Sequence, residues 1–379
     1  MIYLDNAATT LPKPREVIDA MAWAAGHLAS PGRGSSSASA QADELLYDLR
    51  LTAGEMFECP PQQVILTASA THGLNIALKS LVERGDRVVI SGMEHNAVVR
   101  PLYAVGADIQ VARGRLFDRD ALLADFDRLL TPETKACAVT HVSNVFGWIL
   151  PVEEIAAMCV QRGIPLVVDA SQSAGTLQVS LRELQAAFVA MPGHKGLLGP
   201  QGTGLLLCGH ASRTLLEGGT GSVSRQREMP EFLPDRLESG TPNIPGAAGL
   251  LAGMRHVRRE GTDLIRRREA DLREILVSSL SRIPGTEVFA GEAQTGVVSF
   301  RVRGRDSVLL AGQLAEDGIA LRAGLHCAPL AHETAGTEET GTIRASLGPF
   351  NRQENVRALI RQIRIRLEKP EYDGLFTKN

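Results

Sequence analysis

Short apolar runs alternate with longer amphipathic stretches between about residues 60 and 210, and this alternation constrains the fold more than any other feature of the sequence. The runs are typical of buried strands, and the stretches between them have the length and spacing of helices. Such alternation predicts an α/β fold, with a mainly parallel sheet covered by helices on both faces. The predicted strands are 87–90, 108–111, 136–140, 165–169, 187–190 and 204–207, and the predicted helices include 73–83, 119–130 and 152–162.

The pattern changes after about residue 255. A helix is expected over 262–282, then a strand at 296–300, a helix near 306–317, a strand near 342–345 and a last helix from 352 onward. The 379 residues also exceed the roughly 250–300 at which single cores stop growing. We therefore predict a large domain at 1–255 and a smaller α+β domain at 256–379.

Charge and cysteine usage exclude several classes of protein. The net charge of -3 gives no overall electrostatic argument for binding nucleic acid, since proteins that bind it usually have a basic face. No apolar window of about 20 residues could span a membrane, and the first residues lack a secretory signal. The five widely spaced cysteines contain no C-x-x-C pair, which indicates reduced thiols in the cytoplasm. The Gly/Ser-rich segment 30–39 is expected to be a connecting loop or a lid over the site.

A lysine surrounded by glycines follows one predicted strand. Lys195 lies in the glycine-rich segment 191–204, directly after the strand at 187–190. Ligands of parallel sheets bind beyond the carboxyl ends of the strands, and the usual phosphate-loop pattern is absent here. Lys195 therefore favours an amine that condenses with a carbonyl group, and a solvated turn lysine is the alternative.

Asp169 ends another predicted strand, 165–169, at the same edge of the sheet. A carboxylate there can pair with the protonated ring nitrogen of pyridoxal phosphate, beside a lysine that binds this cofactor covalently. A helix cap is the alternative role for Asp169. Taken with Lys195, the carboxylate favours the cofactor.

Three further positions carry weaker signals. The segment 67–75, with Ala70 and Thr71, opens a helix whose free N–H groups could hold a phosphate or be capped in the ordinary way. His95 follows the strand at 87–90 and could contact a cofactor or be a satisfied polar residue. Arg344 is a charge within an apolar strand pattern, which suits a substrate carboxylate or an internal ion pair.

One cysteine differs from the other four. Cys327 lies in a loop bounded by Gly324 and Pro329, where the neighbouring His326 could help to ionise its thiol. The other cysteines lie in apolar or unremarkable contexts and are expected to be inert. A metal site built on His326, Cys327 and His332 lacks a fourth ligand.

Taken in order, these residues resemble the cysteine desulfurase family, class V pyridoxal-phosphate enzymes of fold type I. The resemblance covers nearly the whole chain and is closest to the group II desulfurases and selenocysteine lyases, because the cysteine has a short Arg-x-Gly-x-His-Cys setting. The matching stretches are 3–10 (YLDNAATT), 94–95 (EH), 143–147 (SNVFG), 169–172 (DASQ), 193–195 (GHK), 238–243 (ESGTPN) and 344–347 (RASL).

The resemblance implies a fold-type I transferase that converts L-cysteine into L-alanine and leaves the sulfur on Cys327 as a persulfide. It implies a homodimer, a sulfur-acceptor protein as a possible partner, and a role for each matching residue.

Four residues would contact the ring of the cofactor in this family. Lys195 would hold the cofactor and move protons, and Asp169 would pair with the ring nitrogen. Gln172 would bond the phenolic oxygen, and His95 would stack on the ring.

The resemblance also implies roles at the phosphate and the substrate. Ala70, Thr71 and His194 would hold the phosphate, and Thr220 could reach it across the dimer interface. Asn144 would lie beside cofactor and substrate, and Arg344 would bind the substrate carboxylate.

The sequence departs from the family at Pro192, where relatives often have a serine or threonine that contacts the phosphate, so phosphate binding must depend on other groups. Three alternatives stay open. A selenocysteine lyase would use nearly the same site, whereas an aminotransferase or β-eliminating lyase would not need Cys327. A non-catalytic sulfur carrier is the third, and the intact Lys195 and Asp169 argue against it.

Overall fold

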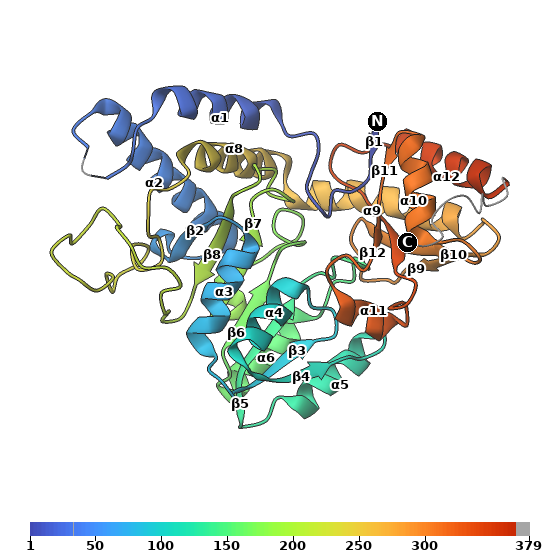
Figure 1. The fold of residues 1–379 in the computed structure, drawn as a ribbon, viewed down its shortest axis with the longest axis horizontal. Coiled ribbons are helices and arrows are strands. Elements are labelled where there is room, and N and C mark those ends of the chain that lie inside the picture. Colours follow the sequence, from blue (N-terminus) through green and yellow to red (C-terminus); the bar gives the residue numbers. More distant parts are fainter. Residues whose placement is uncertain (33, 369–379) are drawn as a thin grey trace, which may run out of the picture.

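A seven-stranded sheet forms the centre of the larger part of the molecule in the computed structural model, which describes residues 1–32 and 34–368 (Figure 1). In spatial order its strands are β2 (Val64–Thr67), β8 (Gly204–Cys208), β7 (Phe188–Pro192), β6 (Leu166–Asp169), β5 (Thr134–Thr140), β3 (Arg87–Ser91) and β4 (Asp108–Ala112). The five strands from β7 to β4 are parallel, which confirms the predicted sheet. The strand β8 is antiparallel to both neighbours, because the short connection from β7 contains no crossover helix.

Helices cover both faces of this sheet, as the strand–helix alternation predicts. Val88 and Ile90 pack with the helices of one face, and Val89 between them packs with those of the other. The first face carries α3 (Ala70–Leu81) and α4 (Asn96–Val105). The second carries α2 (Ser37–Phe57), α5 (Arg119–Leu129), α6 (Val152–Arg162), the short α7 (Leu181–Leu184) and α8 (Ile244–Glu260), with η1 (Pro61–Gln63) beside α2 and α1 (Arg15–His27) packed on α8.

Helix α8 is not among the helices named from the sequence, because its glycines obscure the apolar pattern. Those glycines have a packing role. A Cβ at Gly253 would lie 2.4 Å from the carbonyl oxygen of Leu197, so only glycine lets α8 approach the loop that carries Lys195. This close packing fixes the loop from behind.

A four-stranded antiparallel sheet forms the C-terminal part, with the predicted helices against it. Its spatial order is β12 (Arg322–Gly324), β13 (Thr342–Ser346), β10 (Val297–Val302) and β9 (Thr286–Phe289). Helices α9 (Thr262–Leu280), α10 (Ser307–Glu316) and α12 (Gln353–Glu368) share its core, and α11 (Pro329–Ala335) follows β12. This sheet with its helices is the smaller α+β part that the sequence predicts.

The N-terminal segment joins the two parts. Strand β1 (Ile2–Tyr3) pairs with β11 (Ile319–Ala320), and Leu4 lies in the C-terminal core (Figure 1). The chain then crosses to the larger part, where the hydroxyl of Thr10 donates to the carbonyl oxygen of Lys195 at 3.2 Å. The predicted domain boundary after residue 255 falls within α8 and stays a prediction.

The expected loop at 30–39 is shorter than predicted, and residue 33 lies outside the described residues. The side chain of Ser36 accepts a hydrogen bond from the backbone N–H of Ser39 and starts α2 at Ser37. Residues 30–32 line a separate cavity of about 810 Å³ together with Thr220.

Candidate active site

A cavity of about 220 Å³ lies where β5, β6 and β7 end, at the carboxyl edge that the sequence predicts for a ligand. The C-terminal part closes one side of it. Of the residues named from the sequence, the cavity brings together Ala70, Thr71, His95, Asn144, Asp169, Gln172, His194, Lys195, Cys327 and Arg344. Thr220 lines the separate larger cavity instead, so its expected contact across a dimer interface stays a prediction.

Lys195 lies in a tight turn after β7 that demands glycine. A Cβ at Gly196 would lie 2.4 Å from the carbonyl oxygen of Ala174, and the N–H of Gly199 donates to the carbonyl oxygen of Gly193 at 2.8 Å. Burial lowers the pKa of Lys195 to about 8, although the carboxylate of Asp169 opposes this change. The amine can therefore be neutral, and so nucleophilic or basic, close to physiological pH.

Asp169 is buried at the end of β6 and held by backbone groups. Its Oδ1 accepts from the N–H of Ser171 at 2.9 Å, and its carbonyl oxygen accepts from the N–H of His141 at 3.0 Å. A turn follows Asp169 and not an α-helix, so the alternative of a helix cap is wrong. The carboxylate is oriented before any ligand binds.

His95 has a local structural role as well as a place in the cavity. Its Nδ1 accepts from the N–H of Ala97 at 3.0 Å and so caps helix α4. Burial lowers its pKa, which keeps the ring neutral. The cap confirms the expectation of a satisfied polar residue, and the contact of His95 with a cofactor stays a prediction.

The preceding residue, Glu94, is a buried acid that the sequence analysis did not single out. Its Oε1 accepts from the hydroxyl of Ser91 at 2.5 Å and from the N–H of Thr140 at 2.8 Å. Its Oε2 has no partner among residues 1–32 and 34–368. Burial raises the pKa of Glu94 to about 8, and the neighbouring Asp169 adds to this effect.

One end of the cavity suits a phosphate group. It is formed by the start of α3, where Ser69 caps the helix, and by His194. The Nδ1 atom of His194 is buried without a partner in the described chain. Burial, Lys195 and Lys13 together lower the pKa of His194 to about 4, so its neutral ring can donate one N–H to an anion.

Lys13 is a charge beside this end that sequence reasoning missed. Its Nζ donates to Thr10 Oγ1 at 2.5 Å and to the carbonyl oxygen of His194 at 2.7 Å. Pro192 lines the cavity and offers no hydroxyl, and Lys13 supplies positive charge close by. No local pattern marked Lys13, because it approaches the cavity from the N-terminal crossing segment.

Arg344 is almost fully buried and forms the internal ion pair that the sequence analysis named as an alternative. One terminal nitrogen donates to Asp5 Oδ1 at 2.6 Å and the other to the carbonyl oxygen of Asn144 at 2.8 Å. Its Nε has no partner in the described chain. The two terminal nitrogens therefore fix the guanidinium in direction, while Arg344 itself lines the cavity.

Cys327 lies on a constrained loop at the mouth of the cavity. It is the one exposed cysteine of the five, and both it and His326 have positive φ angles, 58° and 50°. The N–H of Asn96 donates to the carbonyl oxygen of Cys327, and the side chain of Asn144 donates to that of His326, each at 2.8 Å. The larger part of the molecule thus holds this loop in place.

The expectation that His326 helps to ionise the thiol is wrong. Its Nε2 lies 3.1 Å from the carbonyl oxygen of Thr342, and burial lowers its pKa to about 2, so the ring stays neutral. The cation beside the thiol is Arg322, whose Nη2 lies 3.9 Å from Sγ. Arg322 lies five residues before Cys327, on β12, and the strand pairing brings it to the cavity.

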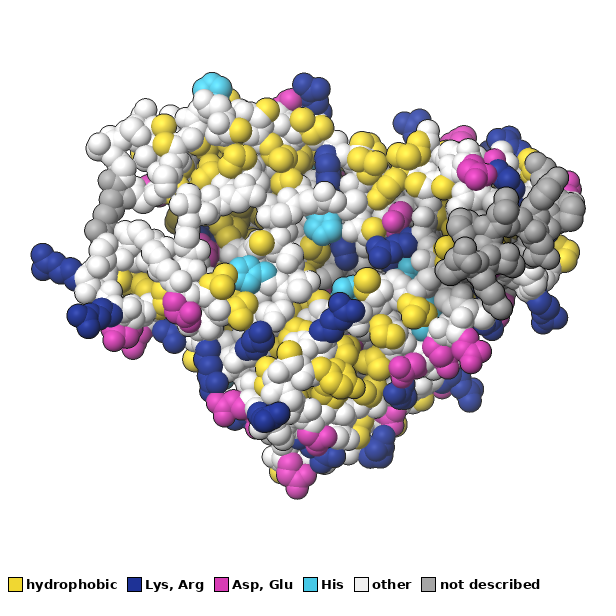
Figure 2. Space-filling view, viewed as in Figure 1, with side chains coloured by type: hydrophobic (Ala, Val, Ile, Leu, Met, Phe, Trp, Pro, Cys, Tyr) yellow, Lys and Arg dark blue, Asp and Glu magenta, His cyan; other side chains and the backbone are white. Residues whose placement is uncertain are grey.

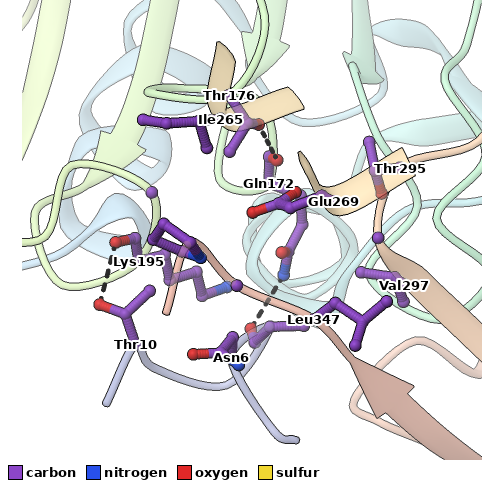
Figure 3. Close-up of a pocket in the computed structure, with 15 residues that line it drawn as sticks. Asn6, Thr10, Gln172, Thr176, Lys195, Ile265, Glu269, Thr295, Val297 and Leu347 are labelled. Carbon is purple, nitrogen blue, oxygen red and sulfur yellow. Dashed lines mark hydrogen bonds between the residues drawn. The ribbon is translucent and has the colours of Figure 1, made fainter. Parts of the chain in front are cut away.

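A second, smaller cavity of about 40 Å³ lies behind Lys195, against helix α9. Figure 3 shows Glu269 projecting from this helix beside Gln172, with Lys195 and Thr10 across the cavity. The amide nitrogen of Gln172 donates to the carbonyl oxygen of Ala7 at 3.0 Å, which fixes this side chain. Burial alone raises the pKa of Glu269 to about 8.

Comparison with known proteins identifies the relatives of this site. Residues 2–359 match the family described as aminotransferase class-V. The chain belongs to the class-V aminotransferase family. This class-V chain is 35% identical over 380 residues to a probable cysteine desulfurase of Xylella fastidiosa, covering 95% of this chain and 89% of that protein. A probable cysteine desulfurase of Methanothermobacter thermautotrophicus is 34% identical, covering 94% and 92%.

The fold of this class-V chain also matches solved structures. The apo structure of a cysteine desulfurase from Thermococcus onnurineus superposes with a TM-score of 0.88 at 30% identity, over 97% of this chain and 94% of that one. This likeness confirms the predicted fold-type I architecture.

Pyridoxal phosphate is the cofactor of class-V enzymes, and the residues present fit it. The cavity offers an amine with a lowered pKa at Lys195, an oriented carboxylate at Asp169 and an unpartnered buried nitrogen at His194. These match the aldehyde, ring nitrogen and phosphate of the cofactor in turn. Among the described residues, no group of three His, Cys, Asp or Glu side chains could hold a metal ion.

Proposed function

We propose that the chain is a pyridoxal-phosphate-dependent cysteine desulfurase that moves the sulfur of L-cysteine onto Cys327. The observation that carries this proposal is the exposed Cys327 thiol at the mouth of the Lys195 cavity, beside an arginine. The names of relatives with 34–35% identity over nearly the whole chain support the same reaction. An aminotransferase or simple lyase would have no use for that thiol.

The residues around the cofactor ring would have separate roles in proton transfer. Bound pyridoxal phosphate supplies an electron sink for the pair left when the Cα–H bond of the substrate breaks. Lys195 would accept that proton, since its pKa of about 8 lets it bind and release protons near neutrality. Asp169 would keep the ring nitrogen protonated, and His95 and Gln172 would fix the ring.

Arg344 and Asn144 would orient the substrate through its carboxylate. The Nε of Arg344 is free, and Asn144 holds both that guanidinium and the Cys327 loop. A cysteine bound there would direct its sulfur toward the loop. Arg322 would place a positive charge beside the sulfur of Cys327 during the attack on the substrate sulfur.

The sulfur transfer balances without another reactant. The Cβ–S bond of L-cysteine breaks, a bond forms between that sulfur and Sγ of Cys327, and the protons released are returned to carbon. The products are L-alanine and a persulfide on Cys327. Selenocysteine would fit the same groups, and its weaker carbon–selenium bond makes a lyase reaction the second candidate.

A single experiment tests the proposal. The holoenzyme is incubated with L-cysteine, alanine is quantified, and each cysteine is examined by mass spectrometry. We expect alanine and a mass gain of one sulfur on Cys327. A gain on Cys59, Cys137, Cys159 or Cys208, or alanine formation without any gain, would contradict this mechanism.

We further propose a cytoplasmic homodimer that passes its sulfur to an acceptor. All five cysteines are free, which suits a reducing compartment. Among the residues that the structure describes, no helix is long and apolar enough to cross a membrane. The segment with Thr220 lines a large cavity away from Lys195, which suits a contact to a second copy of the chain.

A further inference from the structure

A groove outside the active-site cavity shares Cys327 with it. The groove measures about 340 Å³ and is more open than the cavity. Thr71, His95, Ala97 and Cys327 line both spaces, so the thiol lies between an inner chamber and an outer surface. The rest of the groove comes from helices α3 and α4: Asn75, Asn96, Arg100, Pro101 and Ala104.

The groove is positively charged. Its lining contains Arg100 and no aspartate or glutamate. Arg100 is exposed, and within residues 1–32 and 34–368 it makes no ion pair with an acid. Arg322 lies at the thiol itself. Figure 2 shows Lys, Arg and His side chains gathered near the middle of this face, between α4 and the C-terminal part.

The proposed reaction requires a second thiol at this place. Each turnover leaves Cys327 as a persulfide, and the enzyme works again only after that sulfur is removed. A thiolate attacks the outer sulfur, a new S–S bond forms to the attacker, the old S–S bond breaks, and Cys327 leaves as a thiolate. Cofactor and substrate occupy the inner chamber, so the attacking thiol must approach through the groove.

We propose that the outer groove is the acceptor subsite and that Arg100 selects a thiol carrying a carboxylate. This inference rests on the proposed desulfurase function. The exposed guanidinium of Arg100 on the first turns of α4 would pair with the carboxylate, while the thiol reaches Cys327. A small thiol that carries a carboxylate has this chemistry and a size suited to a groove of about 340 Å³.

The first test measures sulfur removal directly. Holoenzyme carrying the Cys327 persulfide is mixed with 3-mercaptopropionate, 2-mercaptoethanol or cysteamine, and loss of the persulfide is timed. Rates are corrected for the intrinsic reactivity of each thiolate. We expect Arg100→Gln to slow the anionic thiol roughly two- to fivefold, the size of one exposed ion pair, to leave 2-mercaptoethanol little changed, and not to slow the cationic cysteamine. Added salt should shrink the effect.

A matched variant and a substrate readout sharpen that test. Arg364→Gln removes the same charge from the exposed face of α12, far along the chain, and should change none of the rates. The burst of alanine from L-cysteine should also be the same in Arg100→Gln and wild type. A slower burst would place Arg100 on the path of the substrate and overturn the inference, as would equal slowing of all three thiols.

The second test needs neither cofactor nor persulfide. Iodoacetate is anionic and iodoacetamide is neutral, and both alkylate an exposed thiol. At Cys327, Arg100→Gln should lower the ratio of the iodoacetate rate to the iodoacetamide rate by the same two- to fivefold. An unchanged ratio refutes charge selection in the groove even if the enzyme proves to be a desulfurase. If Arg100→Gln lowers this ratio but the wild-type enzyme forms no persulfide, the anion subsite is supported and only the desulfurase proposal is refuted.

Discussion

The floor and the mouth of the cavity are built in different ways. The floor consists of side chains at or just after the ends of parallel strands, and neighbouring residues orient two of them: Ser171 binds Asp169, and Ala97 binds His95. The mouth consists of Arg322 and Arg344, which come from the C-terminal sheet, and of Cys327 on the loop after β12. Hydrogen bonds from Asn96 and Asn144 of the larger part hold the mouth. The floor is thus preorganised locally, whereas the mouth depends on how the two parts pack.

This difference separates two chemical tasks. The floor would hold the cofactor whether or not sulfur is transferred, and the mouth would decide where the sulfur goes. Substitutions in the floor should therefore remove cofactor and all reactions together. Substitutions in the mouth should leave the bound cofactor intact and change only the reaction.

The largest effect is expected in the floor. Lys195→Ala should abolish covalent attachment of pyridoxal phosphate, because no other described lysine lies in the cavity lining. Reduction with borohydride followed by intact mass spectrometry measures the attachment. Lys135→Ala, which removes an exposed lysine outside the cavity lining, is the control and should keep the attachment. A reducible link that persists in Lys195→Ala would show that the floor is misassigned.

The mouth should show the opposite behaviour. Cys327→Ser should bind the cofactor normally, yet form alanine from L-cysteine only at background level, because no nucleophile accepts the sulfur. Selenocysteine should still react, since selenium leaves more readily than sulfur. Visible absorption and alanine assays with both substrates measure these outcomes. Wild-type turnover of L-cysteine by this variant would remove the distinction between floor and mouth.

Packing of the mouth can be weakened through the ion pair of Arg344 and Asp5. The arginine side chain is 2% exposed and the aspartate 18%. Asp5→Asn should lower the free energy of unfolding by roughly 3–5 kcal/mol, because it leaves a buried charge without its partner. Denaturant unfolding measures the loss. Asp19→Asn, which breaks the exposed pair with Arg15, should cost about 0–1 kcal/mol. Equal losses in the two variants would mean that the buried pair does not hold the mouth.

The last effect is gradual, because it is spread over several pH units, and it concerns the protonation of Glu94. Glu94 is uncharged in the folded chain until about pH 8, whereas in the unfolded chain it ionises near its ordinary pKa of 4.5. Between these values only the unfolded state releases the proton, so stability falls as pH rises. The fall is at most about 1.4 kcal/mol per pH unit and ends above pH 8.

Unfolding of the apoenzyme across pH 5–8 checks this prediction. In Glu94→Gln the free energy of unfolding should fall less steeply with rising pH than in wild type. Glu269→Gln should reduce the slope by an equal amount, because burial raises both pKa values to about 8. Of these two acids, Glu94 is the one whose pKa is also raised by the neighbouring Asp169. In the holoenzyme, therefore, Glu94→Gln should change the pH dependence of cofactor absorption and Glu269→Gln should not. Identical slopes in wild type and Glu94→Gln would indicate an ionised Glu94.

Much of the floor could be predicted from the sequence. Lys195 and Asp169 each follow an apolar strand, and parallel strands bring their carboxyl ends to one edge. The boundaries of the eight strands named from the sequence agree with prediction to within about two residues, since buried strands need continuous apolar runs. The strands β1, β2, β9, β11 and β12 were not named. Helix α8 was missed because its glycines serve packing against the Lys195 loop and weaken the helical pattern.

The sequence by itself thus determined the α/β sheet, its ligand-binding edge and the residue types there, because these follow from local hydrophobic periodicity. Only the tertiary structure decided the mouth. It turned His326 away from the thiol, placed Arg322 beside Cys327, and paired Asp5 with Arg344 across 339 residues of chain. Contacts of this kind depend on how separately folded segments pack and on which charges are buried together, and no local pattern of residues encodes that.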